Sequence, residues 1–247
     1  MNQTSPLAAV AGGLSGRNLD AMLVSGAPNV RYLTGFTGDN GAVLVAGGRA
    51  TLFTDPRFEI QAAQEAASAA CRVKISRGPL LVDVVAAIKR LGLRRIGYEP
   101  ARMTCDAFEL MKSKLPMRAS LEPAAGWIEQ LRMVKSAEEL ARIRRSVETN
   151  SRAFEQTARR VRAGMKESDL AAELEYRMRR LGAEKPSFDT IVAGGARSAL
   201  PHAQPTAARL AAGQLVVVDM GALQDGYCSD MTRMLFLGNP DGKVKRT

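Results

Sequence analysis

The chain has 247 residues, 46% of them hydrophobic, and a formal net charge of +10 at pH 7. This length is enough for one large domain or two ordinary ones, each with its own core. No apolar stretch approaches the roughly 20 residues that span a bilayer, so we expect no membrane partner. The first residues lack the basic and apolar regions of a secretory signal, so we expect no leader.

The three cysteines, Cys71, Cys105 and Cys228, are scattered along the chain and form no CxxC pair. An odd and scattered set argues against a disulfide framework and against a thiolate metal site. We therefore expect a reducing compartment, the cytoplasm.

Much of the positive charge lies between Lys135 and Arg180, where arginines crowd two predicted helices and alternate with glutamates. Such charges mostly fall off the apolar stripes, as on any solvated helix face. No DNA-binding or RNA-binding motif accompanies them, so we do not expect a nucleic-acid partner.

The first half of the chain alternates short apolar runs with segments of helical periodicity. Strands are predicted at 19–24, 42–45, 49–53, 72–75 and 94–98, and helices at 58–70, 80–91 and 104–115. Gly47 and Gly48 indicate a hairpin, Gly92 a helix end and Thr104 a helix cap. This alternation predicts an α/β domain over about residues 1–125.

In the second half, Ser136 and Glu139 form a capping box that opens a long helix ending at Gly164. Its apolar positions recur at helical spacing: Leu140, Ile143, Val147, Phe154 and Val161. Ser168 is predicted to cap a second helix, which Gly182 ends. The apolar face of this second helix comprises Leu170, Leu174, Met178 and Leu181. A strand at 187–193 and a loop then lead to the last predicted element.

That element is a hairpin between residues 215 and 237. Two apolar runs flank Asp225 and Gly226, and an Asp-Gly pair in this setting is the strongest short-range hairpin signal. With this pair as the turn, Asp219 lies opposite Thr232, and Asp230 lies on the same face as both. Asp219 and Asp230 are then diagonal neighbours, roughly 7–8 Å apart at the backbone.

Gly221, opposite Asp230, is expected to leave room between these carboxylates. Two such groups should repel each other unless a cation or a proton neutralises them. A divalent ion that prefers oxygen ligands, such as Mg, Mn or Co, with Zn possible, is the economical answer. Thr232 could hold a ligand carboxylate in place. The alternative is that Asp219 and Asp230 are ordinary solvated residues.

His202 is the only histidine and lies in the loop 200–205, which leads into the strand that carries Asp219. Histidine is the side chain best suited to pass protons near neutrality, so His202 is a candidate catalytic residue. The alternative is a plain surface residue. A multi-histidine metal site is excluded within these residues, as is an HExxH motif.

These segments resemble a known family. SFDTIVAGGARSALPHAQPT and LVVVDMGALQDGYCSDMTR are similar to the first half of the catalytic domain of the pita-bread metallopeptidases, most closely Xaa-Pro aminopeptidase and prolidase. LRMVKSAEELARIRR resembles the entry helix of that domain, and RYLTGFTGDNGAVLV and ATLFTDPRF resemble the creatinase-type N-terminal domain. The resemblance implies a creatinase-type α/β domain at 1–127 and the first half of an α+β pita-bread domain at 128–247.

The resemblance further implies that Asp219 and Asp230 are the first two ligands of a dinuclear site, with Mn expected first and Co or Zn as alternatives. His202 matches the active-site histidine of the family, which contacts the substrate and the tetrahedral intermediate. The other ligands, one His and two Glu, belong to the second half of the domain. The chain is therefore expected to be a truncated part of a longer enzyme, inactive alone.

The activity so implied is removal of an N-terminal residue before proline, as in an Xaa-Pro aminopeptidase or an Xaa-Pro dipeptidase. The expected partners are peptides with proline in second position and a second copy in a homodimer. One alternative is a creatinase-like hydrolase that works without metal, against which the retained Asp219 and Asp230 argue. Another is a non-enzymatic binding module, which the basic helices and the missing ligands favour and the carboxylate pair and His202 do not.

Overall fold

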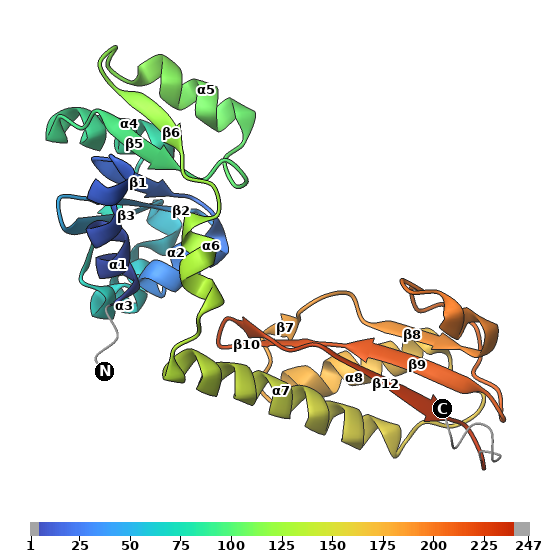
Figure 1. Ribbon diagram of the computed structural model, residues 1–247. Coiled ribbons are helices and arrows are strands. Elements are labelled where there is room, and N and C mark those ends of the chain that lie inside the picture. Colours follow the sequence, from blue (N-terminus) through green and yellow to red (C-terminus); the bar gives the residue numbers. More distant parts are fainter. Residues whose placement is uncertain (1–4, 240–247) are drawn as a thin grey trace. The chain divides into compact units, whose positions relative to one another are not determined.

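The computed structural model describes residues 5–239 and divides into two compact units, Met1–Val134 and Lys135–Thr247 (Figure 1). Helix α6 (Trp127–Met133) ends the first unit and contributes Trp127 and Ile128 to its core. None of the helices within residues 5–239 combines the length and hydropathy needed to cross a bilayer.

The first unit is built on a six-stranded sheet with the order β4-β3-β2-β1-β5-β6. Strand β2 runs antiparallel to β1 and β3, and the other neighbours are parallel. The strands are β1 (Ala21–Val24), β2 (Gly41–Ala46), β3 (Arg49–Thr54), β4 (Cys71–Ile75), β5 (Arg95–Tyr98) and β6 (Ser120–Pro123). All four residues of β1 are buried, as expected for a central strand that is covered on both faces.

Helices cover both faces of this sheet, which makes three layers (Figure 1). They are α1 (Pro6–Gly13), α2 (Ala27–Thr34), α3 (Glu59–Glu65), α4 (Leu80–Leu91), α5 (Cys105–Lys114) and α6. One core packs Met22 and Val24 of β1 against α1, α2 and α6, and the other packs Ala21 and Leu23 against α4 and α5. The alternation of side chains along β1 thus supplies both cores, which confirms the predicted α/β class.

The predicted helix at 58–70 is wrong in its continuity. The segment forms two short 3₁₀ turns, Pro56–Phe58 and Ala67–Ala69, on either side of α3. It ends at Ala70 with φ of 50°, a left-handed conformation that stops any helix. By contrast, α4 ends at Gly92 and α5 begins after Thr104, whose side chain accepts a hydrogen bond from Ala107 N, as predicted.

In the second unit, the α-helices α7 (Ala137–Ala158) and α8 (Glu167–Arg180) cover one face of the strands (Figure 1). One three-stranded sheet has the order β12-β9-β8 and the other β11-β10-β7. The strands are β7 (Lys185–Pro186), β8 (Ile191–Gly194), β9 (Leu215–Met220), β10 (Ala222–Gln224), β11 (Tyr227–Cys228) and β12 (Met231–Phe236). The core between helices and strands contains Leu170, Leu174, Met178, Val216 and Val218.

Helix α7 departs from the prediction in its buried face. The capping box at Ser136 is present, but the helix ends at Ala158 instead of Gly164. Two of the residues assigned to its apolar stripe, Leu140 and Val147, are 42% and 46% exposed. The fully buried positions are instead Ser146, Thr149, Asn150, Ala153 and Thr157.

Helix α8 begins at Glu167, one residue before the predicted cap Ser168, and its N-cap is Lys166. Its apolar face is as predicted, since Leu170, Leu174 and Met178 are buried. The shifted start places the Glu167 side chain in the first turn, where it is also buried.

Candidate active site

The hairpin that carries the two aspartates has the predicted register. Asp225 and Gly226 have φ of 50° and 80°, the pair of left-handed residues that a type I′ turn needs. Gln224 pairs with Tyr227 at the turn, and Asp219 pairs with Thr232 further along. The tight turn therefore sets the alignment of the whole ribbon.

Polar side chains from α7 hold the backbone where β9 passes into β10. Ser146 Oγ donates to the carbonyl of Ala222 at 2.7 Å, and Asn150 Nδ2 donates to the carbonyl of Met220 at 3.0 Å. Ser229 Oγ accepts from Ala222 N at 3.0 Å and donates to Ser146 O at 3.2 Å. These buried bonds satisfy backbone groups at the strand break, which explains the polar buried face of α7.

Strand β9 turns one face to the helices and the other away from them. Val216, Val218 and Met220 are buried in the core under α7 and α8. Asp219 therefore points to the opposite face, where it is half-buried. Thr232 lies directly across from it on β12, and its Oγ1 donates to Asp219 Oδ1 at 2.7 Å.

Asp230 lies immediately before β12, two residues from Thr232, and is exposed. Among residues 5–239, no lysine or arginine forms an ion pair with Asp219 or Asp230. Two carboxylates, one on β9 and one just before β12, supply the oxygen donors that a hard divalent ion prefers. The set is small, because the described part of the chain holds no group of three or more His, Cys, Asp or Glu side chains that could hold a metal.

The prediction that Gly221 leaves room between the carboxylates is wrong. A Cβ at this position would lie 2.1 Å from Ser187 Oγ, 2.2 Å from the Ser229 carbonyl oxygen and 2.7 Å from Phe188 Cε1. The missing side chain instead lets the segment before β8 approach the hairpin, where Ser187 Oγ donates to Ser229 O at 2.9 Å.

His202 is exposed in a loop that crosses the Asp219 face of the sheet. The next residue, Ala203, is buried against Ile191, Ala193 and Val217. Val217 is two residues before Asp219 on β9, and Ile191 pairs with Asp219 itself. The structure therefore brings the loop of His202 to the same face as Asp219 and Thr232.

Glu167 is a residue of this region that the sequence did not reveal. Its carboxylate, 1% exposed, accepts hydrogen bonds from Gly194 N, from Arg197 Nε and from both N and Oγ1 of Thr206. Burial opposes the charged form, but the bonds from Thr206 and Gly194 and the charge of Arg197 outweigh it, so the pKa lies below its usual value. A glutamate in the first turn of a helix is ordinarily explained by its favourable interaction with the helix dipole, so nothing in the sequence singled out Glu167.

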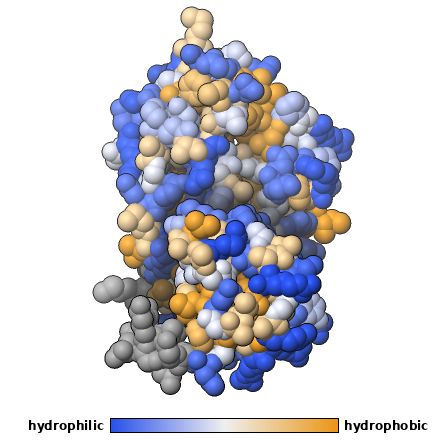
Figure 2. Space-filling view, turned by 90° about the vertical axis from the view of Figure 1, so that its right-hand side faces the viewer, coloured by the Kyte–Doolittle hydropathy of each residue, from blue (hydrophilic) through white to orange (hydrophobic). Residues whose placement is uncertain are grey.

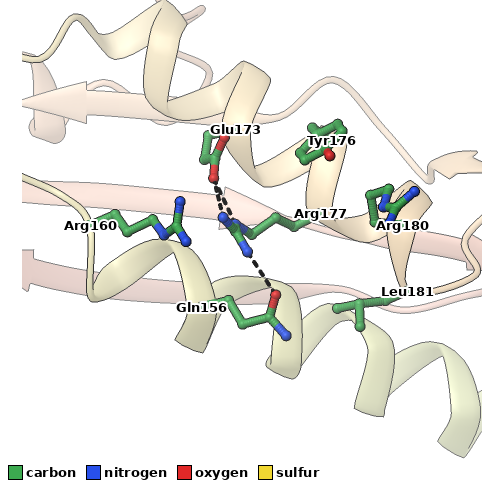
Figure 3. Close-up of a pocket in the computed structure, with 7 residues that line it drawn as sticks. All are labelled: Gln156, Arg160, Glu173, Tyr176, Arg177, Arg180 and Leu181. Carbon is green, nitrogen blue, oxygen red and sulfur yellow. Dashed lines mark hydrogen bonds and ion pairs between the residues drawn. The ribbon is translucent and has the colours of Figure 1, made fainter.

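A separate groove of about 510 Å³ lies between α7 and α8 (Figure 3). Arg177 crosses it and donates to Glu173 Oε1 at 2.7 Å and to Gln156 Oε1 at 2.9 Å, so its charge is compensated within the groove. Arg160 and Arg180 flank it on either side (Figure 3). None of its lining residues is a histidine or one of the paired aspartates, so the groove is distinct from the candidate site.

Two family models match the chain. Creatinase/Prolidase N-terminal domain covers residues 7–134, and Metallopeptidase family M24 covers residues 141–247. The uncharacterized peptidase YqhT of Bacillus subtilis is 36% identical over 228 residues, which are 92% of this chain and 64% of that protein. The Xaa-Pro dipeptidase of Pyrococcus horikoshii is 33% identical over 229 residues, 92% of this chain and 63% of that protein. The chain thus spans less than two thirds of these relatives.

Solved structures of similar fold also match the chain. An Xaa-Pro dipeptidase from Bacillus anthracis superposes with a TM-score of 0.90 at 32% identity and covers 98% of this chain and 67% of its own. An X-Pro aminopeptidase from Thermotoga maritima superposes with a TM-score of 0.87 at 34% identity, covering 94% of this chain and 67% of its own. These structures confirm the predicted fold class, an N-terminal α/β domain followed by part of a pita-bread domain.

Proposed function

Because the chain belongs to the M24 metallopeptidases that carry a Creatinase/Prolidase N-terminal domain, we propose that it is part of a metal-dependent exopeptidase specific for proline. The proposed reaction removes an N-terminal residue that precedes proline, as an Xaa-Pro aminopeptidase or an Xaa-Pro dipeptidase. The observation that carries the proposal is the pair Asp219 and Thr232, bonded in register beside Asp230 on the face that the loop of His202 crosses.

Peptidases of family M24 are dinuclear metalloenzymes. We propose that Asp219 and Asp230 hold part of such a site, with Mn²⁺ as the first choice and Co²⁺ or Zn²⁺ as alternatives. When bound, these ions supply Lewis-acid polarisation of the scissile carbonyl. Thr232 engages Oδ1 of Asp219 and so fixes the direction in which Oδ2 points.

His202 is proposed to contact the substrate from the loop above the sheet. Its exposure leaves the imidazole accessible to a peptide, and the buried Ala203 next to it fixes the backbone over the Asp219 face. A histidine so placed can donate a hydrogen bond to a peptide carbonyl and exchange a proton with it. The donor set among residues 5–239 is small, so we propose that further ligands come from the part of the relatives' length that this chain does not cover.

The proposal also covers the cellular compartment, the oligomeric state and the substrates. The three cysteines form no disulfide within residues 5–239, and we propose a reducing compartment such as the cytoplasm. The family resemblance supports a homodimer, with peptides that have proline in second position as substrates.

The metal site is tested in this chain by calorimetric titration with Mn²⁺. The variants are Asp219→Asn and Asp230→Asn, and the matched control is Asp225→Asn. Asp225 lies in the same hairpin, pairs with Arg145 and occupies a turn position that asparagine also favours. We expect each site variant to lose Mn²⁺ binding and the control to keep it.

The reaction is tested in a protein extended by the downstream sequence, with release of the first residue from an Xaa-Pro peptide as the readout. We expect activity that requires Mn²⁺ and that falls at least about a hundredfold in either site variant. Activity that ignores added metal and chelator, or that survives both substitutions, would contradict the proposal.

A further inference from the structure

Among the described residues, every hydrogen bond that the Glu167 carboxylate accepts comes from one loop. The donors are Gly194 N at 2.9 Å, Arg197 Nε at 3.2 Å, and Thr206 N at 3.0 Å and Oγ1 at 2.7 Å. They lie at the start, inside and at the end of the segment 194–206. A buried carboxylate needs several donors to offset its desolvation, and here a helix residue obtains them all from a neighbouring loop.

His202 lies between the second and third of these anchor points. Arg197, which is held by Glu167, also donates through Nη2 to the carbonyl of Gln204 at 2.8 Å, two residues after His202. Ala203, the residue between them, is buried. The backbone around His202 is thus held by the burial of Ala203 and by the bonds of Glu167 and Arg197.

The same helix start is joined to the end of the loop by backbone bonds. Glu167 N donates to Ala208 O at 3.0 Å, and Ser168 N donates to Thr206 O at 3.0 Å. These bonds hold residues 206–208 against α8 without reaching the part of the loop that contains His202. By contrast, the Glu167 side chain, with Arg197, joins the helix to both halves of the loop.

We propose that Glu167 is a positioning residue that holds His202 over the Asp219 face through Arg197 and Thr206. The inference rests on the proposed function for the role of His202, but the hydrogen bonds that carry it do not. The loop begins with a short 3₁₀ helix, Gly195–Ala199, but residues 200–205 belong to no helix or strand, so their conformation depends on such side-chain anchors. Removal of the Glu167 charge should therefore loosen the loop while α8 and the core under it stay in place.

The sole histidine makes this testable in the 247-residue chain. Because His202 is the only histidine, its imidazole gives a single Cε1–H NMR signal that needs no assignment. Mn²⁺ is paramagnetic and broadens nearby signals steeply with decreasing distance, so the broadening reports how close His202 lies to the ion. Amide hydrogen exchange of Gly194 and Thr206 reports the anchors themselves, without metal.

The variants are Glu167→Gln, which keeps the shape and removes the charge, and Arg197→Met, which leaves Glu167 its bonds to Thr206 should the first variant fold poorly. The matched control is Glu175→Gln, on the same helix and outside the hydrogen bonds of the loop. We expect Gly194 and Thr206 to exchange about tenfold faster in Glu167→Gln. In both variants we expect weaker broadening of the His202 signal by saturating Mn²⁺, and in the control neither change.

Two results separate failure of this inference from failure of the proposed function. If Mn²⁺ binds and broadens the His202 signal equally in wild type and in both folded variants, Glu167 does not position His202 and the inference is overturned. If Mn²⁺ does not broaden the wild-type signal, the metal site of the proposed function is refuted, and amide exchange alone tests the role of Glu167. Unchanged exchange of Gly194 and Thr206 in Glu167→Gln then overturns the inference as well.

Discussion

Gly221 is the position where a single methyl group should do most damage to the candidate site. In Gly221→Ala the new Cβ would lie 2.1 Å from Ser187 Oγ and 2.2 Å from the Ser229 carbonyl oxygen. Both distances are far below van der Waals contact, and one neighbour is backbone. Ser187 cannot simply turn away, because its Oγ donates to that same carbonyl at 2.9 Å and its N–H donates to Gly221 O at 2.9 Å.

The magnitude follows from these contacts. Overpacking of this kind typically costs about 1–3 kcal/mol, and loss of the Ser187 hydrogen bond adds about 1 kcal/mol. We therefore expect the free energy of unfolding of the second unit to fall by about 2–4 kcal/mol. For a unit of this size that lowers Tm by roughly 8–16 °C.

The measurement is thermal unfolding by circular dichroism, with hydrogen–deuterium exchange of peptides from 215–237 to assign the transition to the second unit. The control is Gly78→Ala, where a Cβ meets nothing within 4 Å and φ is not in the left-handed region. It should change Tm little or raise it slightly. If Gly221→Ala has the same Tm as the control, the close approach of Ser187 and Ser229 to Gly221 is refuted.

Three further predictions concern burial and charge. Ser146→Ala should lower the free energy of unfolding in urea by about 1 kcal/mol, because it removes a buried hydrogen bond to the hairpin. Val147→Ser should change it by less than about 0.5 kcal/mol. A larger loss in Val147→Ser than in Ser146→Ala would show that the apolar stripe is the buried face after all. Burial raises the pKa of the Cys71 thiol to about 11, so iodoacetamide at pH 8 should modify exposed Cys105 well before Cys71, as peptide mass spectrometry would show. Glu167 has a folded-state pKa below its ordinary 4.5, so its contribution to stability is complete above pH 4.5 and is lost as the pH falls through the lowered value. The unfolding midpoint should therefore fall more steeply with acid in wild type than in Glu167→Gln, and parallel curves would contradict this.

The hairpin shows what local sequence chemistry can predict. A two-residue turn needs two left-handed residues, and Asp225-Gly226 is among the few pairs that adopt this conformation readily. Once the turn is placed, side-chain alternation determines that Asp219 lies across from Thr232, with no further information needed. For the same reason the caps at Thr104 and Gly92 were predictable, since each depends on neighbours within one helical turn.

Helix α7 shows where periodicity misleads. Apolar spacing selects Leu140 and Val147 as core positions, but both are more than 40% exposed. Exposed hydrophobic residues are visible among hydrophilic ones on the face shown in Figure 2. The helix instead buries Ser146 and Asn150, because it covers a strand break whose carbonyls need donors. That need arises only from the tertiary packing of residues 70 or more positions apart, so no local pattern contains it.

The buried polar groups of the second unit are not spread evenly, and their placement bears on the site. One set, on α7, bonds to the hairpin at Met220 and Ala222, next to Asp219. The other, at the start of α8, bonds to the loop that contains His202. Apolar packing holds the helices on the sheet, but it is not directional. Hydrogen bonds are directional, so these two sets fix the segments that carry the candidate residues to the two most regular elements of the unit. The helices therefore act as the rigid support of the proposed site, although neither contributes a residue to its chemistry.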